Sequence, residues 1–268
     1  MSSCVISALF SDFPSVASSH WHDCHQLIYI VKGEAKITAG EKEYTVKEGT
    51  VAVFNRFEEH SLFSEKGCCE RYIVRISPEK MYSLSKNRLI FSVITNRSEG
   101  FENCVNVGED KEDFEYVFKK IVKEYNSNSP MSDDITDLYV KEILIMLSRY
   151  MPESFFEDAS HISSMVGKVA HLLETDYTTN HTLESIAERF SVSASYMSHR
   201  FKEYTGVSVI KYLNNCRMNV AKRLLTTTGK PIKDIVYECG FSDETNFCRN
   251  FKSINGVTPL AFRKGFSK

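Results

Sequence analysis

The chain has 268 residues and a mass of 30.7 kDa, enough for two compact domains that each bury a core. Hydrophobic residues make up 42% and charged residues 25%, which is typical of an ordinary soluble protein. No apolar run reaches membrane-spanning length, and the N-terminus lacks the pattern of a signal peptide. We therefore expect a cytoplasmic protein with no membrane partner.

The charge is distributed unevenly along the chain. Residues 1–159 contain 18 Lys and Arg against 26 Asp and Glu, a net charge of −8, whereas residues 160–268 contain 15 against 9, a net charge of +6. A basic C-terminal part joined to an acidic remainder suggests that only the C-terminal part meets a polyanion.

The eight cysteines show neither a Cys-x-x-Cys pair nor zinc-finger spacing. Disulfide frameworks and structural zinc are therefore not expected, and the cysteines are interpreted as reduced thiols. The adjacent Cys68 and Cys69 have two interpretations: two small residues at a loop or strand edge, or a sensor of redox state or metal.

Short segments between His20 and Ile76 are rich in Val, Ile, Tyr and Thr, and glycine-containing turns separate several of them. This pattern predicts an antiparallel sandwich or barrel. Two amphipathic or apolar helices are predicted next, at residues 111–125 and 133–151. The proline, serines and acidic residues of 152–164 indicate a linker.

The C-terminal part is predicted to be entirely helical, with seven helices. It contains a repeat: Phe-Lys, three residues, then Gly-Val and a hydroxyl residue occur at Phe201 and again at Phe251, an offset of 50. Each copy follows a short helix and a tight turn, and a helix of nearly twenty residues from Ser208 joins the two copies. This is the arrangement of two helix-turn-helix units, whose second helices enter the major groove of DNA.

The apolar positions of each unit should be buried, which leaves a polar face on each second helix for base edges and phosphates. The predicted DNA-contacting residues are Ser195, Ser198, His199 and Lys202 in the first unit, and Thr245, Asn246, Arg249 and Lys252 in the second.

From about Thr182 to Phe266 the chain closely resembles the DNA-binding domain of AraC/XylS-type transcription regulators. The matching residues are Ile232, Ile235, Gly240-Phe241-Ser242-Asp243, Phe247, Phe251-Lys252, Gly256, Thr258-Pro259 and Phe262-Arg263. The resemblance implies that the helices starting near Ser193 and Ser242 read DNA. Ser195 and Ser198 are shorter than the side chains of many relatives, so phosphate contacts from Lys202 and Lys211 should supply more of the affinity.

The front part of the chain resembles the cupin pattern of His-x-His, a later acid and a further histidine. His20, His22 and Gln26 share strand parity, and His60 comes from a later strand. Three histidines with an acid would bind a divalent metal, but Gln26 stands in place of the acid. No metal or other cofactor is therefore expected.

The resemblance implies instead a metal-free pocket for a small-molecule effector, a sugar or a related metabolite. The simpler alternative is that the histidines make hydrogen bonds inside the barrel and bind no ligand. The helices at 111–125 and 133–151 would then form a homodimer interface, as in relatives. The predicted effector-binding residues are His20, His22, Gln26, His60, Arg71 and Arg75.

The sequence thus predicts an α+β multidomain fold. A cupin-like antiparallel β-barrel occupies residues 1–110, a helical dimerisation segment 111–151, a linker 152–164, and an all-α domain of seven helices with two helix-turn-helix units 165–268. The predicted function is a sequence-specific transcription regulator that binds double-stranded DNA and an effector and is not an enzyme. An activator would also contact RNA polymerase.

Two alternatives stay open. One is a metal-dependent cupin enzyme with an appended DNA-binding domain. The other is a regulator that responds through a protein partner or through Cys68 and Cys69.

Overall fold

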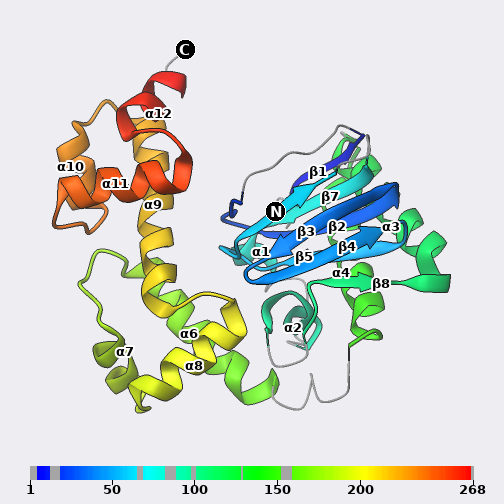
Figure 1. The fold of residues 1–268 in the computed structure, drawn as a ribbon, viewed down its shortest axis with the longest axis horizontal. Helices are drawn as coiled ribbons and strands as arrows, with labels where there is room; N and C mark the ends of the chain where they lie inside the picture. The colour runs from blue at the N-terminus through cyan, green and yellow to red at the C-terminus, as the bar shows by residue number, and fades with distance from the viewer. Residues whose placement is uncertain are drawn as a thin grey trace. The chain divides into compact units, whose positions relative to one another are not determined.

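The computed structural model describes residues 5–12, 19–64, 69–81, 89–97, 101–127, 129–151 and 159–266. The chain divides into two compact units, one formed mainly by residues 1–163 and the other mainly by residues 164–268, here called the β unit and the helical unit (Figure 1). Across these described ranges, no helix is both long enough and apolar enough to cross a bilayer.

The described part of the β unit has eight strands in two sheets, and every strand pairing is antiparallel. The larger sheet has the order β1-β7-β2-β5-β8, and the smaller has the order β4-β3-β6. The predicted antiparallel β-fold is confirmed, although the described strands form two sheets instead of one closed ring. The strands are β1 (Val5–Ser11), β2 (His25–Lys32), β3 (Glu34–Ala39), β4 (Lys42–Lys47), β5 (Thr50–Phe54), β6 (His60–Phe63), β7 (Glu70–Ile76) and β8 (Cys104–Asn106).

The larger sheet is buried on both faces because its strands alternate between two cores. In β2, Ile28 and Ile30 join Ile37 of β3 in the core between the sheets. Leu27 and Tyr29 face the other way, into a core shared with helices. Successive side chains of a strand point to opposite faces, so even-numbered residues of β2 line the interior between the sheets.

Helices α3 (Lys111–Tyr125) and α4 (Ser132–Ser148) cover the outer face of the larger sheet (Figure 1). The Phe118 ring of α3 stacks on Tyr29 at a centroid distance of 5.4 Å. The predicted helix 111–125 is thus confirmed, and α4 ends three residues before the predicted limit at 151. Helices α1 (Pro78–Met81) and α2 (Leu89–Thr95) and the 3-10 turn η1 (Gly108–Asp110) complete this unit.

The helical unit contains seven helices among its described residues, as predicted (Figure 1). Helix α6 begins at Ala159, so part of the range 152–164 that we expected to be a linker is helical. Residues 152–158 of that range lie outside the described residues. The helices are α6 (Ala159–Thr175), α7 (Leu183–Arg189), α8 (Ala194–Thr205), α9 (Val209–Thr227), α10 (Ile232–Glu238), α11 (Glu244–Asn255) and α12 (Pro259–Phe266).

Side-chain caps define several of these helix starts. Thr182 accepts a hydrogen bond from the Ser185 backbone N–H in a capping box, and Ser208 accepts one from the Lys211 N–H. For the last helix-turn-helix helix, the sequence places the start near Ser242, which is slightly too early. The helix begins at Glu244, and its cap is Asp243, whose carboxylate accepts from the Thr245 N–H at 2.8 Å.

Burial makes several of the cysteine thiols unreactive. It raises the pKa of Cys24, Cys104 and Cys239 to about 12. Burial also raises the pKa of Cys69, while Cys68, its expected partner in a sensor, lies outside the described residues.

Candidate DNA-binding interface and effector site

The first helix-turn-helix unit is formed by α7 and α8. The chain leaves α7 through Ser191, which adopts a left-handed conformation with φ 57°. The next residue, Val192, donates its N–H to the Ala187 carbonyl at 3.0 Å. This backbone hydrogen bond closes the turn and starts the approach to α8.

The second unit, α10 and α11, repeats this turn with a different residue. Gly240 has φ 82°, and the Phe241 N–H donates to the Val236 carbonyl at 3.0 Å. The two turn bonds are therefore 49 residues apart, whereas α8 and α11, each of 12 residues, begin 50 residues apart. The second turn has one more residue before its helix. The two units therefore share the same turn hydrogen bond and differ by one residue in turn length.

The predicted interior of both units is confirmed, apart from Val192, which is half-buried. The buried residues are Ile186, Ala187, Met197 and Phe201 in the first unit, and Ile235, Val236, Phe241, Phe247 and Phe251 in the second.

The residues predicted to contact DNA lie on the faces of α8 and α11 that point away from this buried interior. Only Ser198 is half-buried, and the rest are exposed. Their spacing of three, four and seven residues places each set along one helix stripe. In the second stripe, Asn246 accepts a hydrogen bond from Asn250 at 3.3 Å, which orients the side-chain amide. The exposed residues are Ser195, His199 and Lys202 on α8, and Thr245, Asn246, Arg249 and Lys252 on α11.

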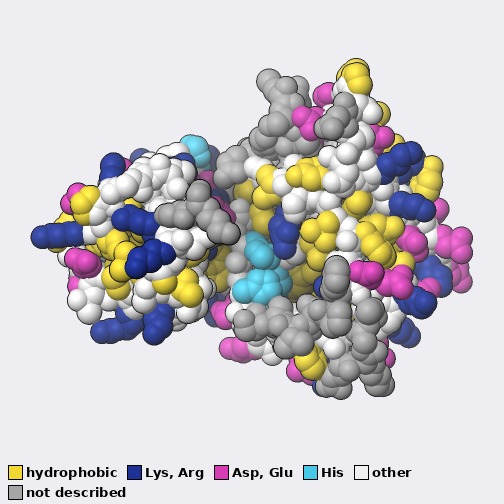
Figure 2. All heavy atoms as spheres, turned by 90° about the horizontal axis from the view of Figure 1, so that it is seen from above, with side chains coloured by type: hydrophobic (Ala, Val, Ile, Leu, Met, Phe, Trp, Pro, Cys, Tyr) yellow, Lys and Arg dark blue, Asp and Glu magenta, His cyan; other side chains and the backbone are white. Residues whose placement is uncertain are grey.

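The cations of these stripes are available for an external anion. Lys202, Arg249 and Lys252 make no ion pair with any residue that the structure describes. Figure 2 shows many Lys and Arg side chains over the visible face of the helical unit. Such a surface attracts the phosphates of a nucleic acid.

An arginine of the long helix α9 connects the second helix-turn-helix unit to the loop before α7, a role that the sequence does not indicate. Arg217 is buried, and its guanidinium donates to the carbonyl oxygens of Tyr177 at 2.7 Å and Thr179 at 2.9 Å. It also lies 5.5 Å from the ring centroid of Phe241 in the second turn. Burial lowers the pKa of Arg217.

The same loop comes close to Gly240. A Cβ atom at Gly240 would lie 2.8 Å from the Thr178 Cα and 3.0 Å from the Tyr177 oxygen. Close approach and positive φ therefore both require glycine at this position. Together with Arg217, this packing holds the second turn against the segment that precedes α7.

In the β unit, backbone pairing brings three histidines together. His20 and His60 exchange two backbone hydrogen bonds, of 3.0 Å and 2.8 Å, as an isolated antiparallel bridge. Residues opposite each other in such a pair place their side chains on the same face. His22 follows two residues after His20, and its carbonyl is held by the Phe57 N–H at 2.9 Å.

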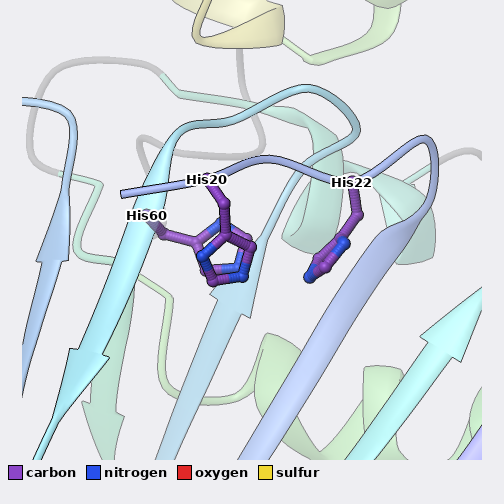
Figure 3. Close-up of side chains that lie close together, drawn as sticks. All are labelled: His20, His22 and His60. Carbon is purple, nitrogen blue, oxygen red and sulfur yellow. The ribbon is translucent and has the colours of Figure 1, made fainter. Parts of the chain in front are cut away.

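The three imidazoles point toward one another (Figure 3). One ring nitrogen from each of His20, His22 and His60 lies within 4.8 Å of the others. The ring centroids of His20 lie 4.8 Å from both neighbours. His60 is buried and stacks on Phe54 at 4.1 Å, while His20 and His22 are half-buried.

The surroundings of His60 fix its protonation state. Burial lowers the pKa of His60 to about 4, so the ring is neutral at neutral pH. Its Nδ1 lies 2.9 Å from the Glu58 carbonyl oxygen and therefore carries the proton. Its Nε2 keeps a lone pair and lies 2.9 Å from the Gln26 Oε1. Since the oxygen and nitrogen of an amide are interchanged by a flip, the flipped Gln26 amide donates its NH₂ group to this lone pair.

Of the two predicted effector-binding arginines, Arg75 lies next to Gln26 in the sheet, whereas Arg71 lies further from the histidines. Arg75 is the direct cross-strand neighbour of Gln26 in the larger sheet. It donates to the Ser7 hydroxyl at 3.2 Å, and its buried Nε has no hydrogen-bond partner among the described residues. Arg71 pairs with Ile30, further along the strand, and donates to the Cys69 carbonyl at 2.7 Å.

Two residues beside His60 position it, and sequence reasoning missed both roles. Phe57 has φ 64°, a conformation that usually requires glycine, and its ring packs edge-on against Trp21. The buried Glu58 carboxylate accepts from the Asn55 N–H, the Arg97 guanidinium and the Asn103 amide. Although burial raises the pKa of Glu58, Arg97 and these hydrogen bonds hold it below its usual range.

Comparisons with known proteins agree with this division. Residues 3–102 match the AraC-like ligand binding domain, and residues 186–265 match a helix-turn-helix domain. The chain is 23% identical over 256 residues to the HTH-type transcriptional activator RhaS of Escherichia coli (strain SE11), covering 95% of this chain and 89% of the relative. RhaS of Shigella sonnei gives the same identity and coverage.

Solved structures of ToxT from Vibrio cholerae share the fold. One has a TM-score of 0.63 and 17% identity over 98% of this chain and 100% of ToxT. Another, bound to an unsaturated fatty acid, has a TM-score of 0.61 and 19% identity over 98% of this chain and 96% of ToxT.

The fold, the doubled helix-turn-helix and the two domain matches define a DNA-binding transcription regulator with a separate small-molecule-binding domain. The chain belongs to the AraC family of transcription regulators.

Proposed function

We propose that the regulator reads its operator with the exposed stripes of α8 and α11, and that a small molecule bound in the β unit controls this reading. The observation that carries the proposal is the repeated turn with an exposed polar stripe on each following helix. The protein would act without catalysis, in the cytoplasm, where the DNA of a bacterial regulator lies.

The spacing of the two units suits neighbouring turns of one duplex. Helix α9 joins them and has 19 residues. At about 1.5 Å per residue it spans roughly 28 Å. Successive major-groove entries on one face of B-DNA are about 34 Å apart. The offsets of α8 and α11 from the ends of α9 would make up the difference.

The side chains suggest a division of roles. Arg249 is suited to guanine and Asn246 to adenine, because each offers two hydrogen-bonding groups in the required geometry. Lys202 and Lys252 are suited to phosphates. Since Ser195 and Ser198 are short, the first unit would contribute less base discrimination than the second.

A selection experiment tests this assignment. The full-length protein is used to enrich duplexes from a random pool, and its affinity for the enriched site is compared with that of Arg249→Ala. We expect the variant to lose about 1–3 kcal/mol and to relax specificity at one base pair. Lys233→Ala, an exposed cation of α10, is the matched control and should bind normally. Equal losses on enriched and random DNA would show that Arg249 contacts only phosphate.

For the effector, the polar interior groups favour a hydroxylated or anionic metabolite, such as a sugar or a sugar acid. His20, His22, Gln26, His60 and Arg75 would supply hydrogen bonds and one positive charge, while Arg71 would contact only a ligand that reaches further along β7. The ToxT structure with bound fatty acid supports an anionic ligand in this fold. Thermal-shift screening of the full chain against sugars and sugar acids tests the assignment, and stabilisation by neither class would contradict it.

A homodimer would form through the helices of the β unit. In α4, Leu138 is 62% exposed, and Ile135 and Ile145 are also exposed, so none of the described residues covers this apolar surface. Leu138→Glu should convert the dimer to a monomer in light-scattering measurements. Tyr237→Glu, which changes an aromatic residue of α10 that is 55% exposed, should stay dimeric. A wild-type monomer at micromolar concentration would contradict the proposal.

The relatives are named as activators, which supports activation through RNA polymerase as the outcome of DNA binding. Transcription in vitro from a promoter carrying the enriched site should rise when the protein is added. A fall in transcript would indicate repression instead.

A further inference from the structure

We propose that His20, His22 and His60 bind one divalent transition metal ion of the zinc, cobalt and nickel class, and that this ion is part of effector recognition. The second half of this statement rests on the proposed function, whereas ion binding itself does not. Three histidines alone form an established zinc ligand set that leaves a fourth position open. The glutamine at position 26 therefore does not argue against a metal.

The backbone of the β unit brings the three imidazoles together before any ion binds. Two hydrogen bonds lock His20 opposite His60, and a third holds the backbone at His22. The Trp21 side chain, between the two histidines in sequence, packs against Phe57. Because alternate residues of an extended segment share a face, this anchoring directs His20 and His22 to the same side.

His60 has the outer contacts typical of a metal ligand. Its Nδ1–H donates to the Glu58 carbonyl at 2.9 Å, which fixes the tautomer and leaves Nε2 for an ion. Stacking on Phe54 at 4.1 Å fixes the plane of the ring. The Gln26 amide, now 2.9 Å from Nε2, would give up this contact and turn toward a water or other group on the ion.

The distances require only a small closure. The ligand nitrogens lie within 4.8 Å of one another. In a tetrahedral site with metal–nitrogen distances of about 2.1 Å, two ligand nitrogens are roughly 3.4 Å apart. Rotations of the half-buried His20 and His22 side chains provide this movement. Because His20 and His22 are only half-buried, an ion can reach the site from solvent.

The charge around the site selects what occupies the fourth position. The three imidazoles and Gln26 carry no negative charge to offset a dication, and the neighbouring Arg75 adds a positive one. An anion on the ion, such as a carboxylate of the effector, would offset both charges. The buried Nε of Arg75, which has no hydrogen-bond partner among the described residues, would gain one from the same anion.

Cobalt absorption spectroscopy on the full-length, untagged protein tests the site. Co²⁺ titration should give the d–d bands of a four-coordinate nitrogen and oxygen site with one ion per chain, and Zn²⁺ should displace it. His20→Gln and His22→Gln, both half-buried and so tolerant of change, should each weaken Co²⁺ binding by at least about 100-fold, more than the loss of an outer contact costs. His171→Gln, an exposed histidine of α6, is the matched control and should bind as the wild type does.

Sodium acetate tests the fourth position. Acetate should shift the cobalt bands of the wild type, and Arg75→Gln should weaken this response without loss of the ion. A band shift that is the same in Arg75→Gln would overturn the role of the anion.

Three results would overturn the metal site: no d–d bands, equal affinity in His20→Gln and the wild type, or a sulfur-to-cobalt charge-transfer band showing that cysteines hold the ion. DNA binding by the same preparations separates the two proposals. If the protein binds its operator normally but does not bind Co²⁺, only the metal-site proposal is rejected. If it binds Co²⁺ but not the operator, only the proposed DNA-binding function is rejected.

Discussion

The helical unit and the β unit place their functional side chains in opposite environments. On α8 and α11 the candidate contacts are exposed, and their cations make no ion pairs among the described residues. In the β unit the candidate contacts lie between strands and are held by one another, as His60 is by Gln26 and Glu58. An exposed stripe suits a large polyanion attracted from a distance, whereas a half-buried cluster suits a small ligand that replaces internal hydrogen bonds.

This difference predicts how each unit responds to change. Contacts on the helical unit should be removable one at a time at little cost to folding. In the β unit, and in the packing that supports the helical stripes, a change should affect stability as well as binding.

The largest expected effect comes from Gly240→Ala, which tests the support of the exposed stripe. The new Cβ would lie 2.8 Å from the Thr178 Cα at a φ of 82°, so backbone must move. We expect the helical unit to lose about 1–3 kcal/mol of unfolding free energy, or more if the loop cannot shift. Urea unfolding followed by circular dichroism measures this loss. Gly229→Ala, with nothing within 4 Å, is the control and should be nearly neutral. Equal stability of the two variants would show that the loop is not packed against the second turn.

The next effect is a pH dependence in the β unit. Burial, with Arg56 and Arg97, lowers the pKa of His25 to about 3, and its Nδ1 accepts from the Arg56 N–H. An unfolded histidine has a pKa of about 6.5, so below that pH the unfolded state binds a proton that the folded state does not. Stability is therefore complete above about pH 6.5 and falls toward pH 3, by at most about 1.4 kcal/mol per pH unit.

Urea unfolding of the β unit between pH 7.5 and pH 5 measures this slope. His25→Gln should reduce this slope by the contribution of one proton, whatever the variant does to stability at neutral pH, and the remaining slope is expected from His60, whose pKa burial also lowers. An unchanged slope in His25→Gln would mean that another group binds the proton.

The smallest effect is that of Lys252→Ala on DNA binding. Loss of one phosphate contact should weaken binding to all sequences by a similar factor and reduce the slope of log affinity against log salt by about 1. Arg75→Gln, which removes a cation from the β unit, should leave this slope unchanged. A loss confined to the enriched site would assign Lys252 to a base instead.

Most of the fold could be predicted from the sequence because helices, turns and strands depend on residues close together in the chain. The repeated helix-turn-helix pattern predicted the helical C-terminal part, and the short segments rich in Val, Ile, Tyr and Thr predicted the antiparallel β-fold. Strand parity also placed Gln26 and Arg75 on one face, and their pairing in the larger sheet agrees. Ser242 and Asp243 are both good caps, which is why the sequence places the start of α11 near Ser242 although Asp243 is its cap.

Features that depend on contacts distant in sequence could not be predicted. Arg217 resembles any cation of a long helix until its carbonyl partners, about forty residues away, are known. Glu58 is one of two adjacent glutamates, and only the fold places Arg97 and Asn103 around it. Phe57 has no local feature that predicts a positive φ.

The central claim is that one chain places α8 and α11 on the same duplex. Hydroxyl-radical footprinting of full-length Leu138→Glu on the enriched site tests it most directly, because a monomer removes the contribution of a second chain. We expect two protected segments about 10 base pairs apart, with Arg249→Ala weakening only one of them. A single protected segment, or two that require two protein molecules, would contradict the claim.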